Sequence, residues 1–286
     1  MDLSMYKVET KATWCPGCGD FAVLRGIQTA LATLEINPKD AVVVSGIGCS
    51  SNLPGFLKAY GFHGLHGRAV PVASGAKLAN PDLKVIVAGG DGDGYGIGLN
   101  HFIHAMRRNL DIKYVVMNNQ VYGLTTGQAS PTTEKAQRTK STPTGVIELP
   151  INPIALALVS GATFVARAFS GDADHLAKMV ELGLKHKGFS LVDVLSPCVT
   201  YNKHNTYQWF RQRIYKLEDN GHNPKSLDEA IKRSYEWDAK TPIGVFYETE
   251  RLTYEDEEPG LKAGPIVNQP LGIDEALGKE LLKEFE

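Results

Sequence analysis

The stretch that decides the fold is Val85-Ile-Val-Ala-Gly-Gly-Asp-Gly-Asp-Gly94. Its first four residues are an apolar run typical of a buried strand, and glycines and carboxylates follow where that strand would end. Similar apolar runs occur at 41–45, 114–117, 162–166 and 191–195. Helical patterns lie between them at 20–34, 69–79, 97–108 and 172–187, and Asn152-Pro153 starts another helix. This alternation predicts an α/β fold, a mostly parallel sheet with helices on both faces.

The alternation ends near residue 200. We expect residues 1–200 to form the main domain and residues 201–286 to form a C-terminal extension. The extension is richer in charged and aromatic residues, with helices expected at 226–238 and 273–285. It would wrap over the main domain or over a partner.

Composition excludes several classes of protein. The 286 residues are 43% hydrophobic and 22% charged, which is ordinary for a globular protein, and a net charge of −2 gives no reason to expect a nucleic acid partner. The N-terminal residues have no apolar core for a signal peptide, and the longest apolar stretch, 151–169, is interrupted by Pro153 and Arg167. We therefore expect a cytoplasmic protein without a membrane span, in which cysteines stay reduced.

A second polar segment, Asn118-Asn119-Gln-Val-Tyr-Gly123, follows the strand expected at 114–117. Carboxyl ends of parallel strands meet at one edge of a sheet, so Asp91 and Asn119 should lie close together. Glycines let backbone amides approach phosphate oxygens, and a carboxylate beside a diphosphate indicates a divalent cation between them. Asp91, the Asn119 side chain and one backbone carbonyl would suit Mg²⁺. The alternative is that the glycines only tighten turns.

The chain contains four cysteines, Cys15, Cys18, Cys49 and Cys198. Cys49 and Cys198 each follow an expected strand, so both could lie at the same end of the sheet as Asp91. Four thiolates suit either a [4Fe–4S] cluster or a zinc ion. Cys49 and Cys198 could also be small core residues, and spacing alone does not separate these possibilities.

The Gly-Asp-Gly and Asn-Asn pair resembles the thiamine-diphosphate fingerprint. In that family the aspartate, the second asparagine and a carbonyl two residues later bind Mg²⁺, which implies Asp91, Asn119 and Val121 here. The motifs CPGCGD, GIGCSS, HGLHGRA, GDGDGYGIG, NNQVYGLTTGQ and SPC occur in this order between about residues 14 and 205. Together they make the chain similar to the β subunit of 2-oxoacid:ferredoxin oxidoreductases.

The resemblance implies a role for each matching position. Cys15, Cys18, Cys49 and Cys198 would ligate a [4Fe–4S] cluster. The residues that would line the cofactor are Gly46, Ile47, Gly48, Cys49, His66, Gly90, Asp91, Gly92, Asp93, Asn119, Val121, Tyr122, Gly123, Leu124 and Thr125. No catalytic residue is assigned in this chain. The glutamate that contacts the aminopyrimidine ring would come from an α subunit, in an α₂β₂ assembly.

The implied reaction is oxidative decarboxylation of a 2-oxoacid with coenzyme A, giving an acyl-CoA, CO₂ and reduced ferredoxin, and reversible to CO₂ fixation. The alternatives are a non-redox thiamine decarboxylase subunit and a zinc-stabilised, non-catalytic binding subunit. The segment 122–128 resembles the 2-oxoglutarate branch more than the pyruvate branch. A distal carboxylate would need a cation or several donors, and the candidates are Asn52, Lys58, Arg68 and Lys77.

Overall fold

The computed structural model describes residues 1–270 and 272–285. Its strands are β1 Ala41–Ser45, β2 Tyr60–His63, β3 Lys84–Gly90, β4 Ile112–Asn118, β5 Phe164–Phe169, β6 Ser190–Leu195, β7 Ile214–Lys216 and β8 Thr241–Glu248. They form one sheet in the order β2-β1-β3-β4-β6-β5-β8-β7. Every neighbouring pair is parallel except β5 and β8. The expectation of a mostly parallel sheet is confirmed.

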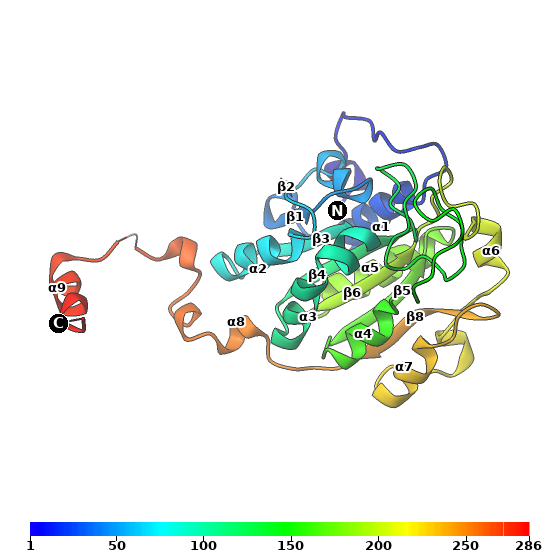
Figure 1. The fold of residues 1–286 in the computed structure, drawn as a ribbon. Coiled ribbons are helices and arrows are strands. Elements are labelled where there is room, and N and C mark those ends of the chain that lie inside the picture. Colours follow the sequence, from blue (N-terminus) through cyan, green and yellow to red (C-terminus); the bar gives the residue numbers. More distant parts are fainter. Residues whose placement is uncertain (271, 286) are drawn as a thin grey trace.

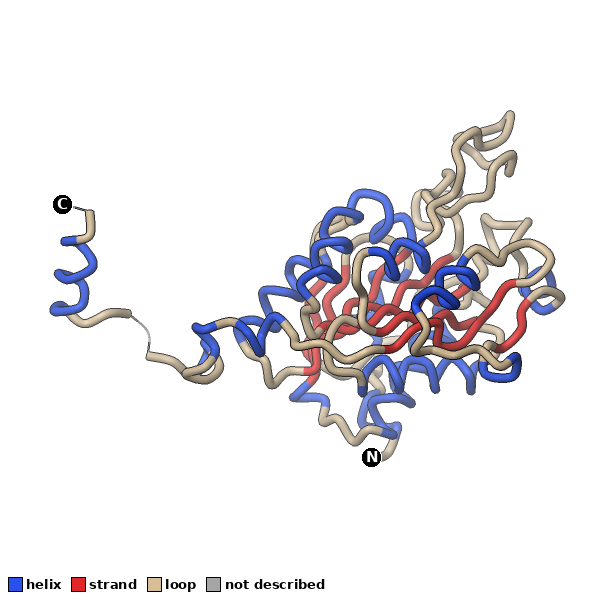
Figure 2. Tube along the Cα trace, turned by 90° about the horizontal axis from the view of Figure 1, so that it is seen from below, coloured by secondary structure: helices blue, strands red, loops and turns tan. Residues whose placement is uncertain are grey.

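Helices cover both faces of this sheet (Figures 1 and 2). They are α1 Asp20–Thr33, α2 Ala69–Ala79, α3 Leu99–Arg108, α4 Pro153–Val159, α5 Ala173–Lys185, α6 Tyr207–Arg211, α7 Leu227–Ser234, α8 Tyr254–Glu257 and α9 Glu275–Lys283. The α1 and α5 helices share one core with the sheet, and α2, α3, α4 and α7 share the other. The sheet is thus the middle of three layers.

Strand β3 shows how the sequence builds the two cores. Successive side chains of a strand point to opposite faces, so Ile86 and Ala88 pack against α1 and α5 while Val85 and Val87 pack on the other side. All four are fully buried. Burial of a valine or isoleucine side chain stabilises a fold by about 1.5–3 kcal/mol. An unbroken apolar run is therefore what a strand buried on both faces requires.

Two helix starts follow from capping residues in the sequence. The Asn152 side chain accepts a hydrogen bond from the Ala155 amide at 3.1 Å, and Asp172 does the same for the His175 amide at 3.2 Å. Removing such a cap costs about 0.5–2 kcal/mol. These contacts confirm that α4 begins after Asn152, and that α5 begins near the expected residue 172.

The C-terminal part differs from its sequence expectation. Strand β8, which the sequence did not indicate, pairs with β5 in antiparallel orientation, and β7 pairs with β8. Residues after 200 therefore widen the same sheet, and the division into two domains at residue 200 stays a prediction. From α8 onward the chain leaves the sheet, and α9 lies away from it (Figure 1). None of the described helices is long and apolar enough to cross a membrane.

Candidate active site

A pocket of about 110 Å³ lies where β1, β3 and β4 reach their carboxyl ends. Ligands of parallel α/β sheets bind at this edge. The structure brings together here every residue expected to line a cofactor except Gly46, and it adds Ser50. The three segments after β1, β3 and β4, which are far apart in the sequence, thus form one surface.

Gly46 lies behind the pocket, where it makes room for the Asp93 carboxylate. A Cβ atom at this position would be 2.1 Å from Asp93 Oδ2, so only glycine fits. Asp93 Oδ1 accepts hydrogen bonds from the backbone amides of Ile47 at 2.9 Å and Gly67 at 2.7 Å, and it lies 2.7 Å from His66 Nδ1. The buried carboxylate therefore fixes the orientation of His66, whose ring lines the pocket.

Asp91 is almost fully buried at the end of β3, and its two oxygens have different surroundings. Oδ2 accepts hydrogen bonds from the hydroxyls of Ser130 at 2.5 Å and Thr132 at 2.6 Å. Within the part of the chain that the structure describes, Oδ1 has a single, long contact of 3.4 Å with the Asn119 amide. Burial raises the pKa of Asp91 to about 6, against the lowering effect of these hydrogen bonds. One oxygen is thus held in place and the other remains available for a ligand.

The segment after β4 turns sharply beside Asp91. Gln120 has a φ angle of 58°, and the Asn119 side chain accepts a hydrogen bond from the Val121 amide at 3.1 Å. This turn keeps the Asn119 side chain and the Val121 backbone on the pocket side. Gly92 faces the Tyr122 ring so closely that a Cβ atom would be 2.2 Å from it. The two loops therefore fit against each other only with glycine at position 92.

The four cysteines gather at the same edge of the sheet. Cys49 lines the pocket, and a Cβ atom built on Gly123 would lie 3.7 Å from Cys49 Sγ and 3.6 Å from Cys198 Sγ. The Cys18 amide donates to the Cys15 carbonyl at 2.9 Å, which closes the turn between these two residues. Among the described residues, no three histidine, cysteine or acidic side chains are close enough to hold a single metal ion.

Burial and neighbouring charges favour the protonated thiols. Burial, followed by the Asp20 charge, raises the pKa of Cys49 to about 11 and raises that of Cys18 further. The charges of Cys49 and Cys198 also act on Cys18, so these thiols are within electrostatic reach of one another. Binding of a metal would have to displace their protons.

Sequence reasoning missed three residues that support the pocket. Ser130 and Thr132 lie in the long loop after β4 and hydrogen-bond Asp91. The Asn202 side chain donates to the Asn119 carbonyl at 3.0 Å. No local pattern marks them, because their partners lie 39, 41 and 83 residues away in the sequence.

Among the candidates for a distal carboxylate, Lys77 is excluded. Lys77 belongs to α2, and its side chain is buried. Its Nζ atom contacts Asp111 at 2.8 Å and donates to two backbone carbonyls. Arg68 is exposed and lies next to pocket residue His66, so it remains a candidate. Asn52 follows the pocket segment that contains Cys49 and Ser50.

Comparison with known proteins identifies the family of the chain. Residues 46–194 match the thiamine pyrophosphate enzyme, C-terminal TPP binding domain, and residues 198–263 match the C-terminal part of the pyruvate ferredoxin oxidoreductase beta subunit. The chain is 49% identical to the beta subunit of 2-oxoacid:ferredoxin oxidoreductase 1 from Aeropyrum pernix, over 86% of this chain and 80% of that protein. It is 50% identical to the corresponding Saccharolobus solfataricus beta subunit, over 85% and 84%.

A solved structure agrees with these sequence matches. The 2-oxoglutarate:ferredoxin oxidoreductase from Magnetococcus marinus, with 2-oxoglutarate, coenzyme A and succinyl-CoA bound, superposes with a TM-score of 0.92 at 39% identity. The match covers 98% of this chain and 96% of that one. With its thiamine-diphosphate-binding domain and these relatives, the chain belongs to the beta subunits of the 2-oxoacid:ferredoxin oxidoreductases.

Proposed function

We propose that this chain, together with an α subunit, catalyses the coenzyme A-dependent oxidative decarboxylation of 2-oxoglutarate and transfers the electrons to ferredoxin. The observation that carries the proposal is the position of Gly123 between the pocket and two thiols. Gly123 lines the pocket, and its virtual Cβ lies within 3.7 Å of both Cys49 Sγ and Cys198 Sγ. A redox group held by these cysteines would lie directly beside a cofactor in the pocket.

A magnesium ion fits the residues around Asp91. The free Oδ1 of Asp91, the Asn119 side chain and the Val121 carbonyl are all oxygen ligands, the kind that Mg²⁺ prefers. Ser130 and Thr132 hold the other Asp91 oxygen and so orient the carboxylate. The ion would neutralise the charge of Asp91 beside a diphosphate.

A [4Fe–4S] cluster fits the proposed reaction better than zinc does. Four thiolates suit either group by number. An electron acceptor beside thiamine chemistry has an evident purpose, whereas a structural zinc ion would accept no electrons. Cys15, Cys18, Cys49 and Cys198 would be its ligands.

Thiamine diphosphate supplies the carbanion chemistry that breaks the bond to the leaving CO₂. The residues of this chain would bind the cofactor and orient the side chains around it. Asp93 holds the His66 ring against the pocket through its Nδ1 atom, so that Nε2 is left for the contents of the pocket. Tyr122 packs edge-on against that ring at 6.2 Å and donates its hydroxyl proton to the Gly92 carbonyl at 3.0 Å.

The small size of the pocket and the apolar side chains at its opening support the proposal that a partner subunit completes the site. Sites that enclose a small molecule measure roughly 300–1,000 Å³, so a pocket of about 110 Å³ forms only part of the wall. Two of the residues that line it, Ile47 and Leu124, are exposed apolar side chains. An α subunit docked on them would complete the site and bring the aminopyrimidine glutamate, in an α₂β₂ assembly.

The substrate preference rests on the solved relative, whose structure contains 2-oxoglutarate. Arg68, an exposed cation two residues after His66 in the sequence, would be the partner of a distal carboxylate from this chain. The α subunit would provide the remaining donors. Pyruvate, which needs no distal cation, is the next candidate.

The first experiment measures iron, acid-labile sulfide and zinc in the complex purified without oxygen, followed by turnover with ferredoxin. We expect about four irons and four sulfides per β subunit and faster turnover with 2-oxoglutarate than with pyruvate. Zinc in place of iron would refute the electron-transfer role. Equal or better turnover with pyruvate would refute the substrate preference alone.

A further inference from the structure

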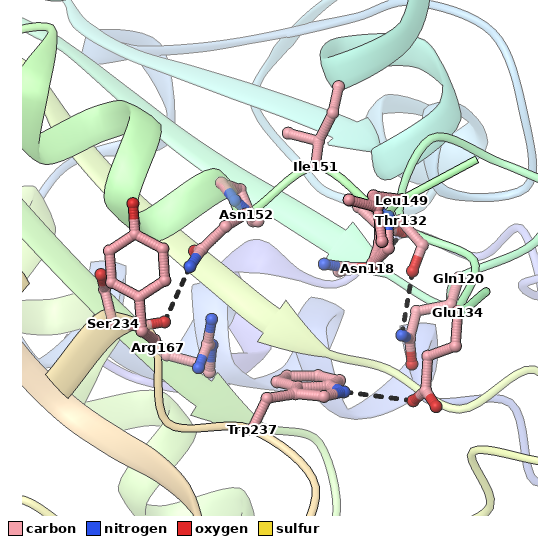
Figure 3. Close-up of a pocket in the computed structure, with 13 residues that line it drawn as sticks. Asn118, Gln120, Thr132, Glu134, Leu149, Ile151, Asn152, Arg167, Ser234 and Trp237 are labelled. Carbon is pink, nitrogen blue, oxygen red and sulfur yellow. Dashed lines mark hydrogen bonds between the residues drawn. The ribbon is translucent and has the colours of Figure 1, made fainter. Parts of the chain in front are cut away.

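A second cavity, of about 310 Å³, lies beside the loop that follows β4 (Figure 3). The end of β4 and the long loop that follows it form one wall, and residues 149–153 at the end of that loop form another. Strand β5 contributes Arg167, and the segment after α7 contributes Trp237. The cavity is distinct from the cofactor pocket, since the two share no lining residue.

The Arg167 guanidinium is the unusual feature of this cavity. The side chain is 2% exposed, and its one hydrogen bond to residues 1–270 and 272–285 joins Nε to Asp193 Oδ2 at a long 3.4 Å. Its Nη1 atom is buried without any partner among the described residues. The Trp237 and Phe246 rings cover the guanidinium at 5.4 Å each. The edge of the guanidinium that carries the N–H groups is left to contact a ligand. In Figure 3 this edge points into the space between Asn152 and Asn118.

The charge of Arg167 is only partly offset. Asp193 also accepts hydrogen bonds from the Tyr95 hydroxyl at 3.0 Å and from Asn118 Nδ2 at 3.2 Å, both shorter than its contact with Arg167. Burial lowers the pKa of Arg167. Glu134, the one acid among the described residues that line the cavity, is occupied by donors from Trp237 at 3.2 Å and Asn205 at 2.7 Å. A further acceptor at the guanidinium edge would therefore be stabilising.

We propose that this cavity binds a small carboxylic acid with an apolar body. Carboxylates and phosphates both match the forked N–H groups of arginine, and a cavity with mostly apolar walls favours the carboxylate of a molecule with an apolar body. The walls are mostly apolar, and Ile151 and Trp237 would contact the body of the ligand. Leu149 and Tyr235 line the cavity and are 77% and 71% exposed, so the cavity opens to the surface between them.

The position of the cavity gives its ligand a route to the metal site. The Thr132 hydroxyl lies 2.6 Å from Asp91 Oδ2 and 3.0 Å from Asn118 Oδ1, and Thr132 and Asn118 both line the cavity. A bound acid would change how Asn118 and Thr132 are held, and with them Asp91. This second step rests on the proposed function, because it assumes that Asp91 binds Mg²⁺.

The test uses phenylacetate as the probe and phenylacetamide as its neutral counterpart. Saturation-transfer NMR and calorimetry on the complete α–β complex should detect phenylacetate at millimolar concentration, and phenylacetamide should bind about tenfold more weakly. Equal binding of the two would refute recognition of a carboxylate. Absence of phenylacetate binding would refute the site.

Two variants and a control locate the binding. Ile151→Trp fills the cavity from its wall and should abolish phenylacetate binding, whereas Ile147→Trp, at an 81% exposed position of the same loop outside the cavity, should not. Arg167→Lys keeps the charge opposite Asp193 but removes the forked donors, and should weaken binding about tenfold. Unchanged binding in both cavity variants would place the acid elsewhere. Saturating phenylacetate should also shift the Mg²⁺ dependence of thiamine diphosphate binding. If the acid binds but this shift is absent, the link to Asp91 fails and the site stands.

Discussion

The Asn202 side chain donates a hydrogen bond to the backbone carbonyl of Asn119, 3.0 Å away. The Asn202 backbone amide in turn donates to the Cys198 carbonyl at 3.1 Å. Asn202 therefore joins the loop after β6, which contains Cys198, to the loop after β4, which turns beside Asp91. The proposed cluster and the proposed magnesium site share this support.

Replacing Asn202 should disturb the cofactor pocket through Asn119. In Asn202→Ala the Asn119 carbonyl loses its donor, and an unsatisfied buried group costs about 1–3 kcal/mol. We expect thiamine diphosphate to bind about tenfold more weakly in the presence of Mg²⁺, measured by calorimetry. Asn223→Ala, at an exposed position, is the control and should bind normally. An unaltered affinity in Asn202→Ala would show that this hydrogen bond does not position the loop.

Asp91 should be essential for metal-dependent binding. Asp91→Asn keeps the size of the side chain and leaves an oxygen for Ser130 and Thr132, but removes the charge that attracts Mg²⁺. Since changes outside the ligand shell already cost 10–100-fold in metal affinity, we expect a loss of about 100-fold or more. Titration of Mg²⁺ against cofactor binding measures it, with Asp82→Asn on the surface as the matched control. Normal Mg²⁺ dependence in Asp91→Asn would rule out Asp91 as a ligand.

Cys15 is the most exposed of the four cysteines, and its replacement tests the cluster with little effect on the core. Cys15→Ser should reduce the iron and sulfide content and bleach the visible absorption, because a hydroxyl replaces a thiolate ligand. Thiamine diphosphate binding should persist, since Cys15 does not line the pocket. Iron and sulfide retained at the level of the unmodified protein would show that Cys15 is not a ligand.

His186 should make the protein less stable in mild acid. Burial, followed by the charge of Lys113, lowers the pKa of His186 to about 4, from 6.5 when exposed. Between these values the unfolded chain binds the proton and the folded one does not, so stability falls as the pH drops from about 6.5 to 4. His186→Gln should flatten this part of the pH dependence of the thermal midpoint. The same slope in both proteins would mean that another group is responsible.

The alternating half of the chain could be predicted from sequence, and the reasons lie in particular residues. The run from Val85 to Ala88 is apolar because both faces of β3 are covered, which makes the strand easy to recognise. Strand β2 is exposed along its whole length at the edge of the sheet, so it has no apolar pattern. Strand β8 contains Pro242 and Gly244, which usually interrupt strands, and its partner β5 lies far away in sequence.

The candidate site was predictable where glycines and ligand residues stand next to strand ends. Asp91 and Asn119 were recognisable because parallel strands end at one edge. Ser130 and Thr132 were not, since only the folded loop brings them to Asp91. Arg167 was read as an interruption of an apolar stretch, whereas it is a fully buried residue of β5 beside the second cavity.

The position of Cys198 after β6 has a consequence for biosynthesis. Cys15 and Cys198 are 183 residues apart (198 − 15), and Cys198 follows the strand that lies between β4 and β5 in the sheet. During translation the first three cysteines leave the ribosome long before the fourth, and strand β6 must insert between its neighbours before Cys198 can reach them. The proposed cluster, with these four cysteines as ligands, would therefore be completed only after most of the sheet has formed. Until then, the thiols of an unfinished chain are open to oxidation or to the wrong metal.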